Sequence, residues 1–167
     1  MKRIVVVALV LWVGFINIAV AQGVAASAKG GAIPPFKMLQ TNGAYFSATD
    51  LPKGKPVVLI YFAPDCEHCQ VLMNDLFKKV NELKTAELVL VTFKPIEDVA
   101  GFEKAYSTHK YPNIKVGTEG TSFFLRYYYK IQNTPFTALY DKNGKALGAY
   151  RNKTDVDDLI KRVKALK

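Results

Sequence analysis

The stretch that decides the fold is Val57-Val58-Leu59-Ile60-Tyr61-Phe62-Ala63-Pro64-Asp65-Cys66-Glu67-His68-Cys69. Its first six residues are all apolar or aromatic, which is typical of a strand buried on both faces. Ala63-Pro64-Asp65 breaks the strand, and a helical pattern begins at about Cys66. The chain has 2 cysteines among its 167 residues, and both lie in this stretch, three positions apart. A buried strand that delivers two thiols to the start of a helix is suited to thiol–disulfide exchange.

The beginning of the chain has the pattern of a secretory signal peptide. Lys2 and Arg3 supply a positive start, and the residues from there to Val20 are almost wholly apolar. Ala19-Val20-Ala21 has the small-x-small form of a cleavage site, so we expect residues 1–21 to be removed and the protein to be exported to the periplasm. An uncleaved membrane anchor is the alternative, because the apolar stretch is near the lower limit for spanning a bilayer.

The rest of the chain is long enough for one domain. Residues 22–35 are rich in Ala, Gly and Ser and predict a flexible lead-in, which leaves residues 36–167 as the domain. Half of all residues are apolar, so this domain can bury a core. Lys and Arg number 23 against 14 Asp and Glu, for a net charge of +9. The basic residues are scattered rather than gathered in a stripe, so we expect no nucleic-acid partner.

The expected export affects how the cysteine pair is interpreted. Outside the cytoplasm, two cysteines often form a structural disulfide. A bridge between Cys66 and Cys69 would close a very small loop, however, and would constrain the unfolded chain little. A pair this close at a helix start is better explained by redox chemistry.

The remaining segments predict an alternation of strands and helices. Segments 36–40 and 44–47 flank Asn42-Gly43 and predict an N-terminal β-hairpin. Further strands are expected over 57–62, 87–93, 136–140 and 145–150, and helices over about 66–83, from Pro95, over 123–129 and after Thr154. The strand–helix–strand beginning implies a parallel pair, and the closing hairpin adds antiparallel strands.

Four local features lead to more specific expectations. Residues 109–120 are interpreted as a loop because they contain one proline and two glycines. Thr121 or Ser122 is expected to cap the following helix, and Thr154 the last one. In the helix over 123–129, an aromatic stripe of Phe124, Tyr127 and Tyr128 is expected to face the core. In the last helix, the stripe that fits the core is Val156, Leu159, Ile160 and Val163.

This order of elements, with CxxC opening the first helix and Thr134-Pro135 before the third core strand, resembles the thioredoxin fold. The N-terminal hairpin and the stretch from Leu51 to Cys69 are similar to the exported thioredoxin-like group that includes TlpA and ResA. The resemblance covers about residues 36–166. It implies an α/β fold in which helices flank a mixed central sheet, with an N-terminal β-hairpin.

The chain departs from these relatives at three positions. Asp65 stands where cytoplasmic thioredoxins carry Trp, and Ile60 stands where they carry a buried Asp. Leu72 stands where ResA-type proteins carry a buried Glu. Neither familiar carboxylate is therefore available to take the proton of the second thiol.

The two thiols are expected to have different roles. The free N–H groups and positive dipole at a helix N-terminus favour a thiolate, so Cys66 is the expected nucleophile. Cys69, one turn further, is expected to be buried and to resolve the mixed disulfide, forming a Cys66–Cys69 disulfide. His68 could lower the pKa of Cys66 by stabilising its thiolate, and the charge of Glu67 would oppose this. The alternative for both is a solvated residue of the first helical turn.

Pro135 resembles the cis-proline that faces the cysteine pair in the thioredoxin fold. The resemblance implies that Thr134, just before it, offers main-chain hydrogen bonds to a substrate strand. A trans turn proline is the alternative.

Together these features predict a thiol–disulfide oxidoreductase that acts on protein thiols and disulfides. We expect a monomer with no metal and no cofactor beyond its redox-active disulfide, served by a membrane or periplasmic redox partner. The resemblance favours reduction of substrates such as apocytochrome c, whereas His68, shared with the Cys-Pro-His-Cys of DsbA-type proteins, favours oxidation.

Two other functions stay open. One is a peroxiredoxin-like peroxidase, although Ala63 stands where peroxiredoxins carry a Thr three residues before the reactive cysteine. The other is copper handling, with Cys66, Cys69, His68 and His109 as soft ligands.

Overall fold

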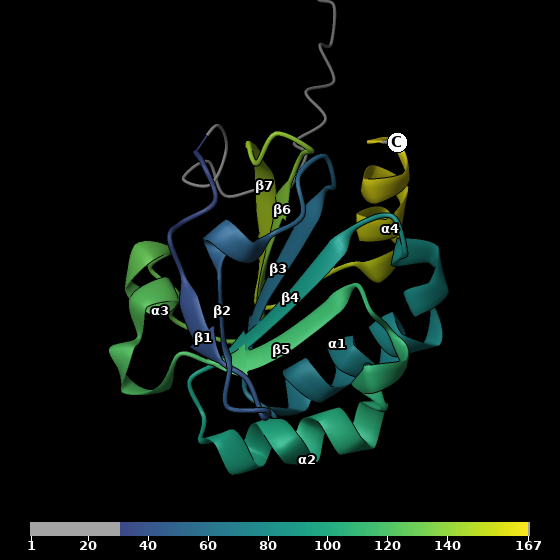
Figure 1. Cartoon of the computed structure of the whole chain (residues 1–167). Helices are drawn as coiled ribbons and strands as arrows, with labels where there is room; N and C mark the ends of the chain where they lie inside the picture. Colours follow the sequence, from purple (N-terminus) through teal and green to yellow (C-terminus); the bar gives the residue numbers. More distant parts are fainter. Residues whose placement is uncertain (1–30, 167) are drawn as a thin grey trace, which may run out of the picture.

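A seven-stranded mixed sheet runs through the middle of the protein (Figure 1). This computed structural model describes residues 31–166. The expected signal peptide, residues 1–21, and most of the expected lead-in lie outside the described residues. Within residues 31–166, no helix is long and apolar enough to cross a membrane.

The sheet joins two antiparallel hairpins to a parallel centre. Its order is β2-β1-β5-β4-β3-β6-β7, in which β3, β4 and β5 run parallel and the other pairs antiparallel. The strands are β1 (Lys37–Leu39), β2 (Tyr45–Ser47), β3 (Val57–Phe62), β4 (Glu87–Thr92), β5 (Ile114–Thr118), β6 (Phe136–Tyr140) and β7 (Ala146–Arg151). The helices are α1 (Glu67–Lys78), α2 (Ile96–Tyr106), α3 (Phe124–Tyr128) and α4 (Val156–Lys164). The predicted α/β fold with an N-terminal β-hairpin is confirmed.

The helices divide between the two faces of the sheet. Helices α1, α2 and α4 cover one face, and the short α3 lies on the other (Figure 1). Alternate residues of β3 enter the two cores: Ile60 packs on the three-helix side and Tyr61 on the α3 side. Because every residue of β3 and β4 is buried, these strands read as continuous runs rather than as an apolar–polar alternation.

The segment interpreted as a loop over 109–120 contains strand β5, so that expectation is wrong. Ile114 and Val116 point into the three-helix core, with Lys115 between them only partly buried, which is a strand pattern. Gly117 does not end the strand. A Cβ there would lie 2.7 Å from the Leu39 carbonyl oxygen, so glycine is what allows β1 to lie against β5.

The aromatic stripe expected in α3 faces outward, which also corrects the prediction. Tyr127 is 74% exposed and Tyr128 is 48% exposed, whereas Leu125 and Tyr129 are buried. Phe123 occupies the N-cap position in place of Thr121 or Ser122. It is in the left-handed backbone region, with φ 47°. The helix turns with the phase that buries Leu125 and Tyr129, which also lie four residues apart.

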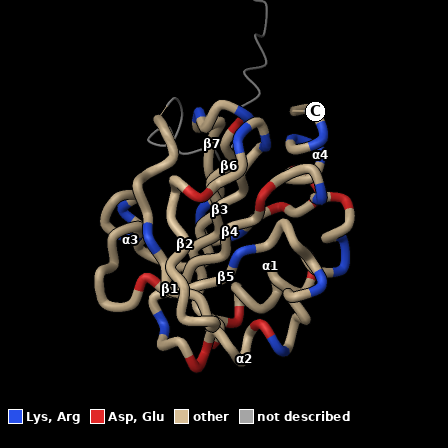
Figure 2. The backbone as a smooth tube through the Cα atoms, in the orientation of Figure 1, with Lys and Arg blue, Asp and Glu red and all other residues tan. Residues whose placement is uncertain are grey.

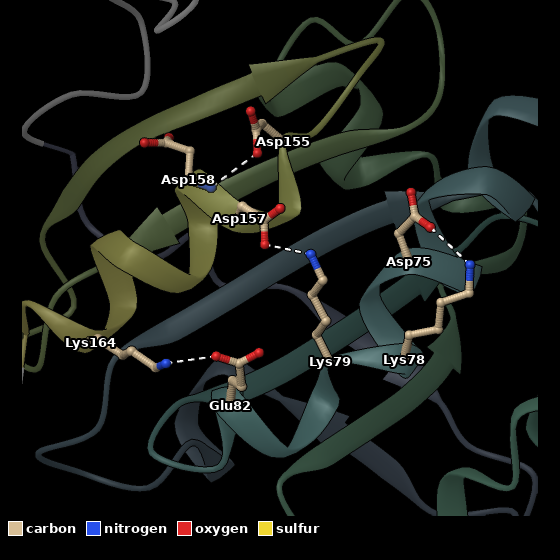
Figure 3. Close-up of polar contacts among 8 residues, drawn as sticks. All are labelled: Asp75, Lys78, Lys79, Glu82, Asp155, Asp157, Asp158 and Lys164. Carbon is tan, nitrogen blue, oxygen red and sulfur yellow. Dashed lines mark hydrogen bonds and ion pairs between the residues drawn. The ribbon is translucent and has the colours of Figure 1, made fainter.

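The last helix confirms its predicted face and corrects its predicted cap. Val156, Leu159, Ile160 and Val163 are all buried. Asp155 is the N-cap residue, and its carboxylate accepts a hydrogen bond from the Asp158 N–H at 3.0 Å (Figure 3). Thr154 is buried instead, with its hydroxyl 2.7 Å from that of Thr137.

Ion pairs tie α4 to the end of α1. The expected helix over 66–83 ends as an α-helix at Lys78 and continues as a 3₁₀ turn over Val80–Leu83. Lys79 lies 2.5 Å from Asp157, and Lys164 lies 2.7 Å from Glu82 (Figure 3). Along the described backbone, basic and acidic residues are interspersed, and the central strands of the sheet carry few charged residues (Figure 2). The two exposed ion pairs between α4 and the end of α1 each stabilise the fold only slightly.

Candidate active site

The two thiols lie where β3 ends and α1 begins. Cys66 is the N-cap residue of α1, and its extended backbone turns the chain from the strand into the helix. Its N–H donates to the Ala63 carbonyl at 3.1 Å, and Gln70 reaches back to the Pro64 carbonyl at 3.0 Å. These bonds fix the short segment between strand and helix, and therefore the position of Cys66.

The two cysteines differ in their exposure to solvent. Cys66 is partly exposed, whereas Cys69 is 1% exposed and packs in the three-helix core beside Leu72 and Met73. Both cysteines are free in the structure. An attacking reagent from solution can reach Cys66 first.

Hydrogen bonds favour the thiolate of Cys66. Partial burial alone would raise the pKa of this thiol. Hydrogen bonds from the Cys69 thiol, the Thr134 side chain and the backbone N–H groups of Cys69 and His68 outweigh that effect and lower the pKa below its ordinary value. Backbone N–H groups at the start of a helix are suited to stabilising a thiolate, because the first turn leaves them without partners in the helix.

The pKa of the Cys69 thiol is raised rather than lowered. Burial, with a smaller contribution from the neighbouring Cys66, raises the pKa of this thiol to about 12. Hydrogen bonds from the Ala63 backbone and the Thr134 side chain act in the other direction without cancelling the effect of burial. At neutral pH the reduced site therefore has one reactive thiol and one protonated thiol.

The Thr134–Pro135 segment faces Cys66. Its peptide bond is cis, and the Cys66 Sγ lies 3.7 Å from the Thr134 carbonyl oxygen. The pairing of Tyr61 with Phe136 places the start of β6 beside the end of β3. The Asn152 N–H, which donates to the Pro135 carbonyl at 3.0 Å, holds the segment from the other side.

A family model described as a thioredoxin-like domain matches residues 50–164. The chain belongs to the thioredoxin-like family. A comparison with curated proteins finds no match.

Solved structures of other thioredoxin-like proteins share the fold. An exposed lipoprotein thioredoxin of Streptococcus pneumoniae is 23% identical, with a TM-score of 0.60 over 80% of this chain and 100% of that one. A secreted Mycobacterium tuberculosis disulfide oxidoreductase homologous to E. coli DsbE is 21% identical, with a TM-score of 0.66 over 79% of this chain and 96% of that one. The peroxidoxin BcpB of M. tuberculosis is 14% identical, with a TM-score of 0.70 over 84% and 98%. At these identities the likenesses show the fold alone.

The first-turn residues of this thioredoxin-like site lie on different sides. Glu67 and His68 are both exposed. His68 lines a cleft of about 530 Å³ together with Cys66, whereas Glu67 is not part of its lining. The structure therefore places the His68 side chain in the same cleft as Cys66.

The cleft contains residues that no sequence motif indicated. Its lining consists of Cys66, His68, Phe93, Arg126, Gln132, Asn133, Thr134 and Asn152. Phe93 directly follows β4. Because the carboxyl ends of parallel strands lie at one edge of a sheet, the sequence could have predicted that Phe93 lies near the end of β3 and therefore near Cys66. Arg126 arrives from α3 on the other face, and its place follows only from the three-dimensional fold.

Lys94 anchors Asp65, the residue that precedes Cys66. Its ammonium nitrogen lies 2.6 Å from an Asp65 carboxylate oxygen. The hydrogen bond from Lys94 lowers the pKa of Asp65, so this carboxylate is charged and compensated. Lys94 thus links the end of β4 to the segment before Cys66.

The structure separates His109 from the other proposed copper ligands. His109 lines a different pocket from Cys66. Among residues 31–166, no three His, Cys, Asp or Glu side chains are grouped in a way that could hold a metal ion.

Ile60 and Leu72 stand at the two positions where related proteins carry a buried carboxylate. Both are buried in the core that contains Cys69.

Proposed function

We propose that this protein is an exported thiol–disulfide oxidoreductase that reduces disulfides of other proteins. The observation that carries the proposal is the contrast between the two thiols. Cys66 is accessible with a lowered pKa, and Cys69 is buried one turn away with a pKa of about 12. Thiol–disulfide exchange by a dithiol needs this difference, because one thiol attacks the substrate while the second stays protonated until the mixed disulfide has formed.

The proposed reaction conserves atoms and electrons. The Cys66 thiolate attacks one sulfur of a substrate disulfide, forms a mixed disulfide and releases the other substrate sulfur as a thiolate, which takes up a proton. The Cys69 thiolate then attacks Cys66, forms the Cys66–Cys69 disulfide and releases the second substrate thiolate. Two electrons pass to the substrate, and a dithiol donor must reduce the Cys66–Cys69 pair again.

Thr134 and Pro135 are proposed to bind the substrate, and His68 to tune the nucleophile. Thr134 lies beside the Cys66 sulfur, where its main chain could align an extended substrate segment. His68 shares the cleft with Cys66, so its imidazole is placed to interact with the thiolate. Glu67 stays a candidate for opposing electrostatic tuning from the same turn.

The direction toward reduction is supported by the resemblance of the stretch from Leu51 to Cys69 to the TlpA and ResA group. In a strongly oxidising pair the thiolate of the attacking cysteine stabilises the reduced form, so the lowered pKa of Cys66 acts toward oxidation. The raised pKa of the buried Cys69 does not decide the direction. From the resemblance, a reduction potential near that of thioredoxin, about −270 mV, is expected rather than one near DsbA, about −120 mV. His68→Pro is expected to shift the potential, and a value near −120 mV for the unaltered protein would reverse the proposed direction.

Export, a monomeric state and a membrane or periplasmic electron donor are part of the proposal. Export is supported by the apolar segment that ends in Ala19-Val20-Ala21. Two of the proteins with similar structures are described as exposed or secreted. Fractionation of cells that express the full chain tests it: the expected product is periplasmic and begins at Gln22.

Insulin reduction tests the proposed activity. The protein, kept reduced by a small dithiol, is expected to accelerate precipitation of the insulin B chain, and Cys66→Ala to abolish that acceleration. Cys69→Ala is expected to accumulate a mixed disulfide with insulin. If Cys66→Ala retained the activity, the proposed function would be wrong. Rapid peroxide consumption by the reduced protein would instead favour the peroxidase.

A further inference from the structure

The cleft beside Cys66 has the chemistry of an anion-binding site. We propose that Arg126 selects substrate proteins that carry an acidic side chain next to the reacting disulfide. Because this selection acts on the exchange reaction proposed above, it holds only if Cys66 carries out that exchange.

The described lining of the cleft includes no acidic residue. Besides Cys66, its ionisable side chains are His68 and Arg126, and the others are Phe93, Gln132, Asn133, Thr134 and Asn152. The amide and hydroxyl groups can donate hydrogen bonds to a carboxylate. A lining of donors and potential cations favours a negative charge near the attacking sulfur.

Arg126 is held in position within the cleft. Its helix, α3, is anchored by Glu119, whose carboxylate accepts a hydrogen bond from the Leu125 N–H at 2.9 Å. One guanidinium nitrogen of Arg126 donates to the Gln132 carbonyl at 3.3 Å, and its Cζ lies 5.8 Å from the centre of the Phe93 ring. A guanidinium fixed by its neighbours loses less freedom when it binds a ligand.

Arg126 keeps most of its donors for a ligand. A guanidinium has five N–H groups, and the contact with Gln132 uses one nitrogen. None of the ion pairs among residues 31–166 includes Arg126. A carboxylate can therefore bind to it through two parallel hydrogen bonds.

The two acidic residues next to Cys66, Asp65 and Glu67, both lie outside the lining of the cleft. Asp65 precedes Cys66, but its carboxylate lies 2.6 Å from the Lys94 ammonium group. It is absent from the lining of the cleft. Its charge is compensated by Lys94, so an anionic group that enters the cleft meets Arg126 in the lining, with Glu67 outside it.

The favoured ligand is a peptide side chain rather than a small thiol. The same cleft is lined by Gln132, Asn133 and Thr134, consecutive residues of the segment before Pro135. An extended polar segment of this kind can bind along a second peptide chain. Glutathione also carries carboxylates, so it serves as the competing small-molecule probe.

The test compares two disulfide-bridged peptides of equal length that differ only beside the reacting cysteine, one with Asp and one with Lys. The ratio of kcat/KM for the Asp peptide to that for the Lys peptide is measured. Arg126→Gln is expected to lower this ratio about threefold to fivefold, the effect of one partly exposed charge pair. Arg126→Lys, which keeps the charge but cannot form two parallel hydrogen bonds, is expected to retain only part of it. Lys142→Gln removes the same charge in the exposed turn between β6 and β7, at the far end of β6 from Pro135, and is expected to leave the ratio unchanged.

The outcomes separate the proposals. If Arg126→Gln slowed both peptides by the same factor, Arg126 would have a structural role only and the inference would be overturned. It would also be overturned if glutathione disulfide, but not the Asp peptide, depended on Arg126. Loss of exchange in Cys66→Ala alongside either result would leave the proposed function standing. If Arg126→Gln failed to fold, the ratio in the unaltered protein would decide: an Asp preference that weakens between 50 and 500 mM salt supports the inference, and a ratio insensitive to salt overturns it.

Discussion

Replacement of Gly117 by alanine should separate β1 from β5. A Cβ at this position would lie 2.7 Å from the Leu39 carbonyl oxygen and 2.9 Å from Cγ of Met38. The Met38 side chain can move, but the carbonyl belongs to the backbone of β1, which pairs with β5 at Leu39 and Thr118. Overpacking of this kind costs about 1–3 kcal/mol. Alanine recovers about 0.5–1 kcal/mol by restricting the unfolded chain, so we expect a net loss of about 1–2 kcal/mol.

Gly101 provides the matched control. It lies in α2, and a Cβ there would have no heavy atom within 4 Å. Gly101→Ala is therefore expected to increase the free energy of unfolding by about 0.5–1 kcal/mol. Urea unfolding followed by circular dichroism gives both values. Because β1 and β2 contribute nothing to the lining of the active-site cleft, insulin reduction below the unfolding transition should be retained in both variants. If Gly117→Ala were as stable as Gly101→Ala, the close approach of β1 would not require a glycine.

Three further predictions concern buried groups. Thr154→Val leaves the Thr137 hydroxyl, now 2.7 Å from that of Thr154, without this partner, and should lower the free energy of unfolding in urea by about 1–3 kcal/mol. The Thr137→Val, Thr154→Val double variant should recover much of the loss, and an additive loss would contradict the pairing. Burial raises the pKa of Glu119, so the folded protein binds this proton more tightly; the resulting stability is complete below the ordinary value of 4.5 and lost as pH rises through the folded pKa. Relative to Glu119→Gln, the unaltered protein should therefore lose stability over that window in urea titrations, and parallel curves would refute this. Cys69→Ala removes a hydrogen bond to the Cys66 thiolate and should move the pH midpoint of Cys66 alkylation upward, whereas a lower midpoint would contradict the assigned hydrogen bond.

The sequence was sufficient for the part of the fold that carries the thiols. The apolar run of β3, the break at Pro64 and two cysteines in the first helical turn are all local signals, and each has one structural interpretation. Strand β5 was missed because Gly117 is also a loop signal, and only the neighbouring β1 explains why a glycine lies within a strand.

The orientation of α3 could not be chosen by periodicity. From Phe123 to Tyr129, Arg126 is the only residue that is neither apolar nor aromatic, so several faces fit the core equally well. The structure buries Leu125 and Tyr129 and leaves Tyr127 exposed. That choice also places Arg126 in the cleft, so the same ambiguity hid both the core face and a candidate binding residue.

The apolar residues at positions 60 and 72 raise the question of how the Cys69 thiol loses its proton. Ile60 and Leu72 occupy the positions from which related proteins supply an acid, and both are buried. Burial is the largest reason for the raised pKa of Cys69, but the hydrogen bond and the charge of Cys66 add to it. Both contributions of Cys66 depend on its sulfur being free.

A mixed disulfide at Cys66 would remove both contributions at once. The hydrogen bonds from the Ala63 backbone and the Thr134 side chain, which favour the Cys69 thiolate, do not require Cys66 to be free. We therefore expect the pKa of Cys69 to fall when Cys66 is linked to a substrate, which would activate the resolving thiol only once its target exists. Blocking Cys66 as a mixed disulfide would allow Cys69 to complete the reaction, so the test uses Cys66→Ala, which removes the same two contributions. In that variant the pH midpoint for alkylation of Cys69, measured by mass spectrometry, should lie below the midpoint measured for Cys69 in the unaltered, reduced protein. An unchanged or higher midpoint would show that burial alone sets the reactivity of Cys69, and the site would then need a proton acceptor supplied by the substrate.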